Sequence, residues 1–431
     1  MSGCRPADDG RTRLRRLGQA HALAQAGDGA FYVTSAAYLV RLGWSPVRVG
    51  ILLAICWGAG ALLSRRIGRL ADRHGLVATS AATLGCCMAG LLGLALGSEP
   101  ILVAGALLVY AGGQSAWGGL RAALVQVAAD PAAAVTERAR LQSIGNGAVA
   151  VGAAVGGLAL GLGDIWALRV VVAGDALLYL VTSLLIARGI RISAPAPTAS
   201  AGHLASAPTA SADRPVAGET GRTTMPQLVA TIAASALYLY MPMLSVALPL
   251  MITNAPGVPA WTISACFLAN TLGVMAMQRR AAIGVTTAAR TRHALLTGAA
   301  LLATSSALLW TTLLGHRLAP ALIVLGLGAG VVTQVLGEVR FAVGAWDLGY
   351  RLAPTSGTAA WQATYGAAIP MARSAGPALL APLTGFELGW IVPAGLFLAG
   401  GIAMASVTTT RPAPSPSDPG TAPYSATEAA P

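Results

Sequence analysis

Five ionisable side chains lie inside long apolar runs of this sequence. They are Asp28, Arg121, Asp175, Glu338 and Arg373. An ionisable group at the centre of a lipid bilayer costs at least about 2.5 to 3.5 kcal/mol, so each position needs a chemical or structural reason. Removal from water makes a carboxyl group hold its proton more tightly, which makes a buried aspartate a candidate for binding and releasing protons.

Asp28 and Arg373 are the strongest candidates for proton coupling. Asp28 lies midway along the first apolar run and Arg373 midway along the eleventh. Two structural alternatives stay open for Asp28: a hydrogen bond to a neighbouring helix, or a permanent ion pair with Arg373, since ion-pair networks perturb the same groups. Arg373 is either the counter-ion of Asp28 or an anchor for an anionic solute.

Arg121 and Glu338 are predicted near the cytoplasmic ends of the fourth and tenth runs. An ion pair between them would close a cytoplasmic gate in one conformation. Alternatively, both side chains reach the membrane interface and keep their charged ends in water. The sequence leaves both interpretations open.

The composition explains why apolar runs dominate. Of 431 residues, 55% are hydrophobic and 10% charged, whereas soluble proteins carry about 25% charged residues. A large soluble enzyme is therefore excluded. The net charge of +12 does not indicate nucleic-acid binding, because the arginines fall in short connectors between the apolar runs and no lysine is present.

Twelve runs are long enough to be transmembrane helices, which need about 20 apolar residues. Their predicted bounds are 17–40, 45–63, 76–96, 101–120, 141–162, 165–187, 227–252, 261–277, 294–314, 319–336, 357–383 and 388–407. The sequence therefore predicts an all-α integral membrane protein with two pseudo-symmetric six-helix bundles.

The domain organisation follows from a polar gap rich in Ala, Pro, Ser and Thr. We predict an N-terminal half (1–187), a flexible cytoplasmic linker (188–224), a C-terminal half (225–410) and a disordered tail (411–431), because such compositions cannot bury a core. Arginines concentrate in alternate connectors, which by the positive-inside rule places both termini in the cytoplasm. The Arg, Ala and Gly bias favours a bacterial plasma (inner) membrane.

The connector after the second run carries the most specific motif, Gly68-Arg69-Leu70-Ala71-Asp72-Arg73-His74-Gly75. It resembles the G-x-x-x-D-R-x-G signature of the major facilitator superfamily, with Gly68, Asp72, Arg73 and Gly75 in register and the trailing basic residues missing. The resemblance implies that Asp72 accepts hydrogen bonds from the start of a helix in the other half and latches one conformation, while Arg73 holds the turn. The alternative is a solvated turn that only enforces topology.

Repetition within the chain favours the same fold. Three residue pairs share one constant offset: Gln114 with Gln334, Gln142 with Gln362, and Gly156 with Gly376. Two halves related by an axis along the membrane normal would produce this pattern. In such a fold the sixth helix is peripheral, so a structural hydrogen bond is favoured for Asp175.

The fifth run is rich in glycine, and Gly152 and Gly156 have the spacing that lets helices approach closely. It resembles the Gly-rich fifth helix of the superfamily's antiporters, but the expected Gly-Pro is absent, and generic small-residue packing is the alternative. The helices expected to border a central cavity carry aromatic and amide side chains that would suit a moderately apolar organic molecule. The candidates are Tyr32, Gln114, Trp117, Tyr238, Gln334 and Trp361.

The resemblance implies a secondary transporter of small organic solutes, of the multidrug or natural-product efflux type, in which two halves rock about a central site. We expect proton-coupled export by a monomer, with the lipid bilayer, a small organic solute and protons as partners; a uniporter or proton symporter is the alternative. No H-E-x-x-H, G-x-S-x-G or P-loop motif occurs, so no catalytic residue, metal site or cofactor is predicted. The chain is therefore not expected to be an enzyme, and the proton gradient would supply the energy.

Overall fold

The computed structural model describes residues 6–130, 133–189, 223–255, 258, 261–285, 287–314, 320–354 and 357–408. Nearly all of the predicted linker and the whole predicted tail lie outside these residues. All the regular structure in the described part is helical. Nine of its helices are long and apolar enough to cross a membrane.

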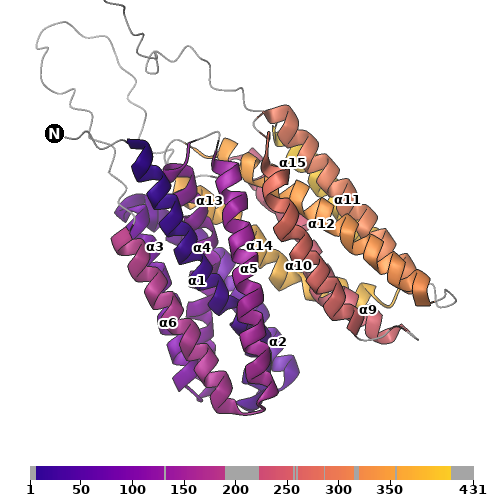
Figure 1. The fold of residues 1–431 in the computed structure, drawn as a ribbon, viewed down its shortest axis with the longest axis horizontal. Helices are drawn as coiled ribbons and strands as arrows, with labels where there is room; N and C mark the ends of the chain where they lie inside the picture. The colour runs from indigo at the N-terminus through magenta and orange to yellow at the C-terminus, as the bar shows by residue number, and fades with distance from the viewer. Residues whose placement is uncertain are drawn as a thin grey trace, which may run out of the picture.

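The N-terminal bundle has six helices (Figure 1, indigo to magenta). They are α1 (Pro6–Arg41), α2 (Pro46–His74), α3 (Leu76–Leu96), α4 (Pro100–Ala128), α5 (Ala134–Gly161) and α6 (Ile165–Gly189). Helix α1 packs against α5 and α6, and α3 packs against α4 and α6. One apolar core joins all six helices, with Tyr110, Trp117 and Tyr179 among its fully buried side chains.

The C-terminal bundle contains two interrupted spans among continuous helices. Its elements are α7 (Met225–Leu237), α8 (Tyr240–Pro242), the π-helix η1 (Met243–Ala247), α9 (Leu248–Asn254), α10 (Trp261–Ala282), α11 (Ala288–Leu314), α12 (Pro320–Arg351), α13 (Thr358–Gly366), α14 (Ala368–Leu383) and α15 (Ile391–Thr408). The seventh span is α7 to α9 and the eleventh is α13 with α14, so the described helices form the twelve expected spans.

Helix α2 shows how local sequence sets an element's bounds. Ser45 caps its start by accepting a hydrogen bond from the Arg48 N–H at 3.4 Å, a role that serine favours. The helix runs through Asp72 to His74 and ends at Gly75, whose φ of 97° only glycine adopts readily. The prediction that the motif forms a connector is therefore wrong: it occupies the last turns of α2, with Gly75 alone as the break.

The predicted ends of α4 and α12 are also corrected. Both helices continue well past the charged residues taken as their limits, to Ala128 and Arg351. Arginine and glutamate are good helix formers, so a charge does not end the backbone hydrogen-bond ladder. Consequently Glu338 lies in the middle of α12 rather than near its end.

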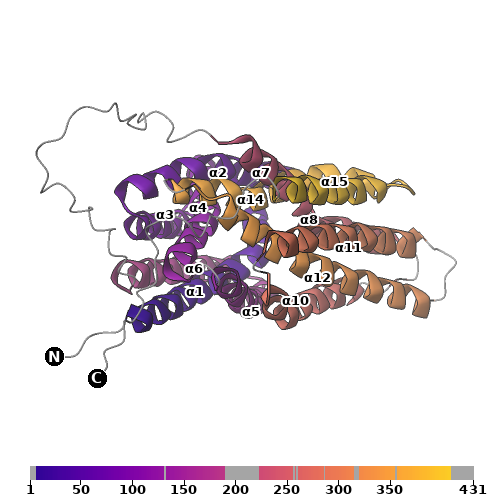
Figure 2. The same cartoon turned by 90° about the horizontal axis from the view of Figure 1, so that it is seen from above.

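The two bundles lie side by side (Figures 1 and 2) and diverge away from the end at which α1 begins (Figure 1). Between them, α2 packs on α13 and α14, α4 on α13, and α5 on α10 and α12. A small cluster that includes Val135, Ala139, Val343 and Trp346 joins α5 to α12, and the Arg138 guanidinium lies 5.4 Å from the ring centre of Trp346.

Candidate functional site

Asp28 lies at the meeting point of α1, α4 and α6. Its side chain is 0% exposed, and its Oδ1 accepts hydrogen bonds from the hydroxyls of Tyr110 (2.7 Å) and Tyr179 (2.8 Å). Gln114 donates to Oδ2 at 3.3 Å. Because three neutral donors surround this carboxyl, it can be held ionised without a cation and can still accept a proton.

A chain of hydrogen bonds connects Asp28 to Arg373 in the other bundle. The Gln114 Nε2 also donates to the Tyr32 hydroxyl at 2.7 Å, and the Arg373 Nη1 donates to the same hydroxyl at 3.3 Å. The Arg373 guanidinium also lies over the Tyr32 ring, 5.2 Å from its centre. In the described residues Asp28 and Arg373 form no direct ion pair, so the structure connects them through two side chains.

Asp175 lies beside Asp28 on the facing helix α6. Its carboxyl group is buried against Gly27, where a side chain on that glycine would overlap Asp175 Oδ1. Within the described structure neither carboxyl oxygen has a hydrogen-bond partner. The structural hydrogen bond expected for Asp175 is therefore not made within the described residues, where the carboxyl packs against Gly27, which has no side-chain donor.

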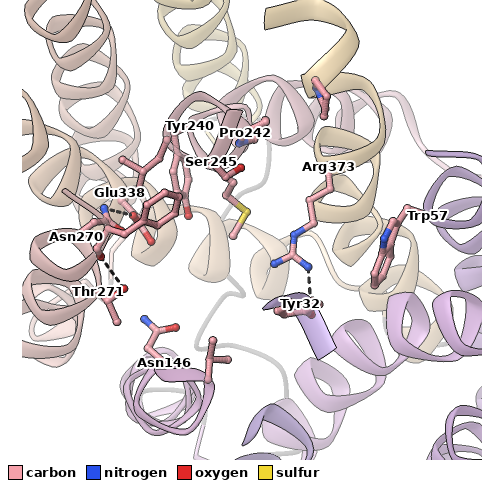
Figure 3. A pocket seen from close by; sticks show the side chains of 15 residues that line it. Tyr32, Trp57, Asn146, Tyr240, Pro242, Ser245, Asn270, Thr271, Glu338 and Arg373 are labelled. Atoms are coloured by element: carbon pink, nitrogen blue, oxygen red, sulfur yellow. Dashed lines mark hydrogen bonds between the residues drawn. The ribbon is translucent and has the colours of Figure 1, made fainter. Parts of the chain in front are cut away.

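A pocket of about 460 Å³ lies between the bundles (Figure 3), a size typical of small-molecule sites. The N-terminal bundle contributes Tyr32, Trp57, Asn146 and Val149. The C-terminal bundle contributes Tyr240, Met241, Pro242, Leu244, Ser245, Phe267, Asn270, Thr271, Glu338, Arg373 and Pro377. The pocket wall is thus largely apolar and aromatic, with one arginine and one glutamate.

Of the six side chains predicted to line the cavity, Tyr32 lies on this pocket, and the other five are not among its lining residues in the described structure. Gln114 supports Tyr32, Trp117 is buried in the core, and Tyr238 packs edge-on against Phe341. Gln334 is fully buried, and Trp361 donates to the Gly349 carbonyl at 2.6 Å. The sequence predicted which helices border the cavity but not which face of each helix lines it. The predicted and observed lining residues differ for this reason.

The predicted gate between Arg121 and Glu338 is not formed. The Arg121 Nη1 instead contacts His21 on α1, 2.6 Å from Nδ1. Glu338 lies on the pocket wall and accepts a hydrogen bond from Asn270 at 3.2 Å. Arg121 lies near the end of α4, whereas Glu338 lies in the middle of α12, because α12 continues far beyond its predicted end.

The Asp72 carboxylate bridges the bundles at the start of α13. It accepts hydrogen bonds from the backbone N–H groups of Ala359 and Ala360, each at 2.9 Å. These N–H groups lie at the positive end of the helix dipole. Gly68, one turn earlier, permits this approach, since a Cβ there would lie 2.6 Å from the Ala359 carbonyl oxygen. The geometry matches what the motif resemblance implies, and the latching role stays a prediction.

Two further motif positions have clear placements. Arg73 is exposed at the end of α2 and makes no hydrogen bond or ion pair with the described residues, so its expected role in holding the turn stays a prediction. Gly152 and Gly156 face α1, where added side chains would overlap the carbonyl oxygens of Ala26 and Ala30. These glycines thus serve packing within the N-terminal bundle and do not face the other half.

Sequence analysis missed three polar partners of the site: His21, Tyr179 and Asn270. A signal existed for two of them. His21 precedes Asp28 by two helical turns, and Tyr179 follows Asp175 by one, so each shares a helix face with a buried acid. Asn270 carries no comparable signal, because its partner Glu338 is distant in sequence.

Comparison with known proteins shows the class of fold. No family model and no curated protein matches the sequence. Solved transporter structures nevertheless match the fold over nearly the whole chain. The chain therefore has the fold of major facilitator superfamily transporters, and the predicted fold class of two six-helix bundles is confirmed. Because nine helices in the described part of the chain are long and apolar enough to cross a membrane, the chain is a multi-pass membrane protein.

Three of these structures represent the similarity. A bacterial homologue of the iron transporter ferroportin, in an outward-facing state, is 16% identical with a TM-score of 0.69, covering 92% of this chain and 99% of its own. The human organic anion transporter MFSD10 is 13% identical with a TM-score of 0.65, covering 94% and 99%. The transporter FucP, in the outward conformation, is 13% identical with a TM-score of 0.65, covering 92% and 99%.

Proposed function

We propose that the chain is a proton-coupled secondary transporter of small organic solutes that works by alternating access. The observation that carries the proposal is the hydrogen-bond chain from Asp28 through Gln114 and Tyr32 to Arg373. It connects a buried acid of the N-terminal bundle to a cation of the C-terminal bundle. This cation lies on the wall of a solute-sized pocket between the two bundles.

The proposed coupling follows from hydrogen-bond capacity. An ionised carboxylate only accepts hydrogen bonds, whereas a protonated one also donates. When Asp28 takes up a proton, its hydrogen bond from Gln114 weakens, and Gln114 can turn away from it. The contact between Gln114 and Tyr32 then changes, and Tyr32 can release Arg373. Proton binding in one bundle would thereby weaken a contact with the other, which is the requirement for coupling to a rocking motion.

The finer assignment is export of the multidrug or natural-product type by a monomer in a bacterial inner membrane. It is supported by the sequence resemblance and by the arginine distribution, from which the positive-inside rule predicts a cytoplasmic linker and cytoplasmic termini. The Asp72 contact would then close the cytoplasmic side, and the diverging ends of the bundles would face outward.

Proteoliposomes that contain a pH-sensitive dye test the function. We expect at least one member of a panel of benzylamines, benzoates and aminomethylbenzoates to drive proton movement through the protein. Asp28→Asn should abolish this movement while solute still equilibrates down its gradient. The matched control is Asp164→Asn, which changes an exposed acid at a helix boundary.

Each outcome of this assay has a defined meaning. Unchanged solute-driven proton movement in Asp28→Asn removes Asp28 from the coupling role. Equilibration without proton movement in the unmodified protein identifies a uniporter. Movement of protons and solute in the same direction identifies a symporter, and movement in opposite directions identifies an antiporter.

A further inference from the structure

Two side chains of opposite charge line the pocket without neutralising each other. Arg373 on α14 and Glu338 on α12 lie on opposite sides of the cavity (Figure 3). In the described part of the chain, neither takes part in an ion pair. Both belong to the C-terminal bundle, so they stay together when the bundles move relative to each other.

Arg373 retains donors for a ligand. Its guanidinium has five N–H groups, and its one hydrogen bond within the described structure goes to the Tyr32 hydroxyl. A guanidinium binds a carboxylate with two parallel hydrogen bonds. An incoming carboxylate would therefore find a free edge of Arg373 and would compete with Tyr32.

Glu338 offers the complementary group. Its Oε2 accepts from the Asn270 amide at 3.2 Å, and the Tyr240 hydroxyl also hydrogen-bonds this carboxyl. Both donors are neutral, and they orient the carboxylate at the pocket wall without cancelling its charge. An ammonium group at this position would form a charge-assisted hydrogen bond with the carboxylate.

The wall between the two charges is mostly aromatic and apolar. Trp57 and Tyr32 lie on the side of Arg373, and Phe267 lies in the helix that carries Asn270. Such a surface favours a flat apolar body. A singly charged solute would leave the opposite wall charge desolvated and unpaired, which is unfavourable.

We propose that the pocket binds zwitterionic solutes in which a flat apolar body separates an anionic group, held by Arg373, from a cationic group, held by Glu338. This inference rests on the proposed transport function and names its solute class. The carboxylate of the solute replaces Tyr32 as the partner of Arg373. Binding of the solute therefore changes the hydrogen bonds of Asp28 through Tyr32 and Gln114.

Calorimetric titration of the purified protein tests the inference without any gradient. The probes are 4-(aminomethyl)benzoate and the longer 4′-(aminomethyl)biphenyl-4-carboxylate, each compared with an analogue in which a methyl group replaces one charged group. We expect at least one zwitterion to bind about tenfold or more tightly than both of its singly charged analogues, as a charge-assisted hydrogen bond provides.

Variants assign the two ends of the ligand. Glu338→Gln should remove the advantage of the zwitterion over the carboxylate-only analogue while retaining carboxylate binding, which also shows that the pocket is folded. Arg373→Gln should remove its advantage over the amine-only analogue. The exposed residues Glu387 and Arg340 provide the controls Glu387→Gln and Arg340→Gln, which should leave all affinities unchanged.

Equal affinity for the zwitterion and the carboxylate-only analogue at both lengths would overturn the inference and identify an anion site in which Glu338 carries a proton. A preference for the amine alone, or no binding of any probe, would overturn it as well. Failure here is distinct from failure of the transport proposal, because binding is measured without transport and transport is judged on Asp28.

Discussion

At the scale of single residues, the hydrogen-bond donors around Asp28 determine the environment of its carboxyl group. The hydroxyls of Tyr110 and Tyr179 converge on one carboxyl oxygen. Hydrogen bonds to a carboxylate favour its ionised form. The two tyrosines therefore tune the pH at which this acid exchanges its proton.

Tyr179→Phe removes one of these donors and leaves the ring in place. Loss of one neutral hydrogen bond, worth about 1 kcal/mol, should displace the pH midpoint of proton-coupled transport from that of the unmodified protein. The measurement is the transport rate in proteoliposomes between pH 5 and 9.

Tyr38→Phe is the matched control, since the Tyr38 hydroxyl is equally buried and donates to the Leu94 carbonyl at 2.6 Å. It should lower stability by a similar amount and leave the pH midpoint in place. If both variants shifted the midpoint equally, the effect would be a general loss of packing.

The acid itself could be predicted from sequence, but its partners could not. Asp28 interrupts an apolar run, and that alone indicates a functional or paired group. Which donors reach it depends on how α4 and α6 rotate against α1, and this is decided by close contacts such as the one at Gly27. The surroundings of Asp175 could not be predicted for the same reason. Its carboxyl group packs against Gly27, and no described residue makes the expected hydrogen bond.

At the scale of elements, the glycines of α5 fix the distance to α1. A Cβ at Gly152 would overlap the Ala26 carbonyl oxygen, whereas a Cβ at Gly157 has no neighbour within 4 Å. Gly152 is therefore required for the close approach of α5 to α1, whereas Gly157, five positions later, is not.

Gly152→Ala should destabilise the N-terminal bundle by about 1–3 kcal/mol, the usual cost of overpacking, and Gly157→Ala should be neutral or slightly stabilising. Thermal unfolding of both purified variants measures this. An equal effect of the two substitutions would show that α5 does not approach α1 as closely as described.

Sequence patterns predicted the bounds of a helix well where the length of its apolar run alone determines them. Helix α3 has its predicted bounds, and α6 differs only at its end. They failed where polar residues continue a helix beyond the membrane, as at Glu338 in α12. The prediction also treated the seventh span as one continuous helix, although Pro242 and Pro249 lie inside it and proline interrupts the helical hydrogen-bond ladder.

At the scale of the whole molecule, the contact between α2 and α13 holds the bundles together at one end. Gly68 allows the approach and Asp72 makes the hydrogen bonds. A conformation that separates these helices must break both contacts. These hydrogen bonds therefore contribute to the described state together with the packing of α4 on α13 and of α5 on α10 and α12.

Gly68→Ala and Asp72→Asn should both shift the population toward states in which this end is open. Spin labels at His74 and Ala289, exposed residues of opposite bundles, report the change as a longer interlabel distance by electron resonance. Gly50→Ala, on the same helix with no neighbour within 4 Å, is the control. Identical distance distributions in all variants would show that the contact does not set the conformation.

The hydrogen bond between Tyr32 and Arg373 has one more consequence. The acid sits in one bundle and both pocket charges sit in the other, and within the described residues the hydrogen-bond chain from Asp28 crosses between the bundles at the Tyr32–Arg373 contact of 3.3 Å. Under the proposed coupling, protons would pass without solute whenever this contact opened before the bundles moved. Proton leakage in the dye assay without added solute would measure such uncoupled passage.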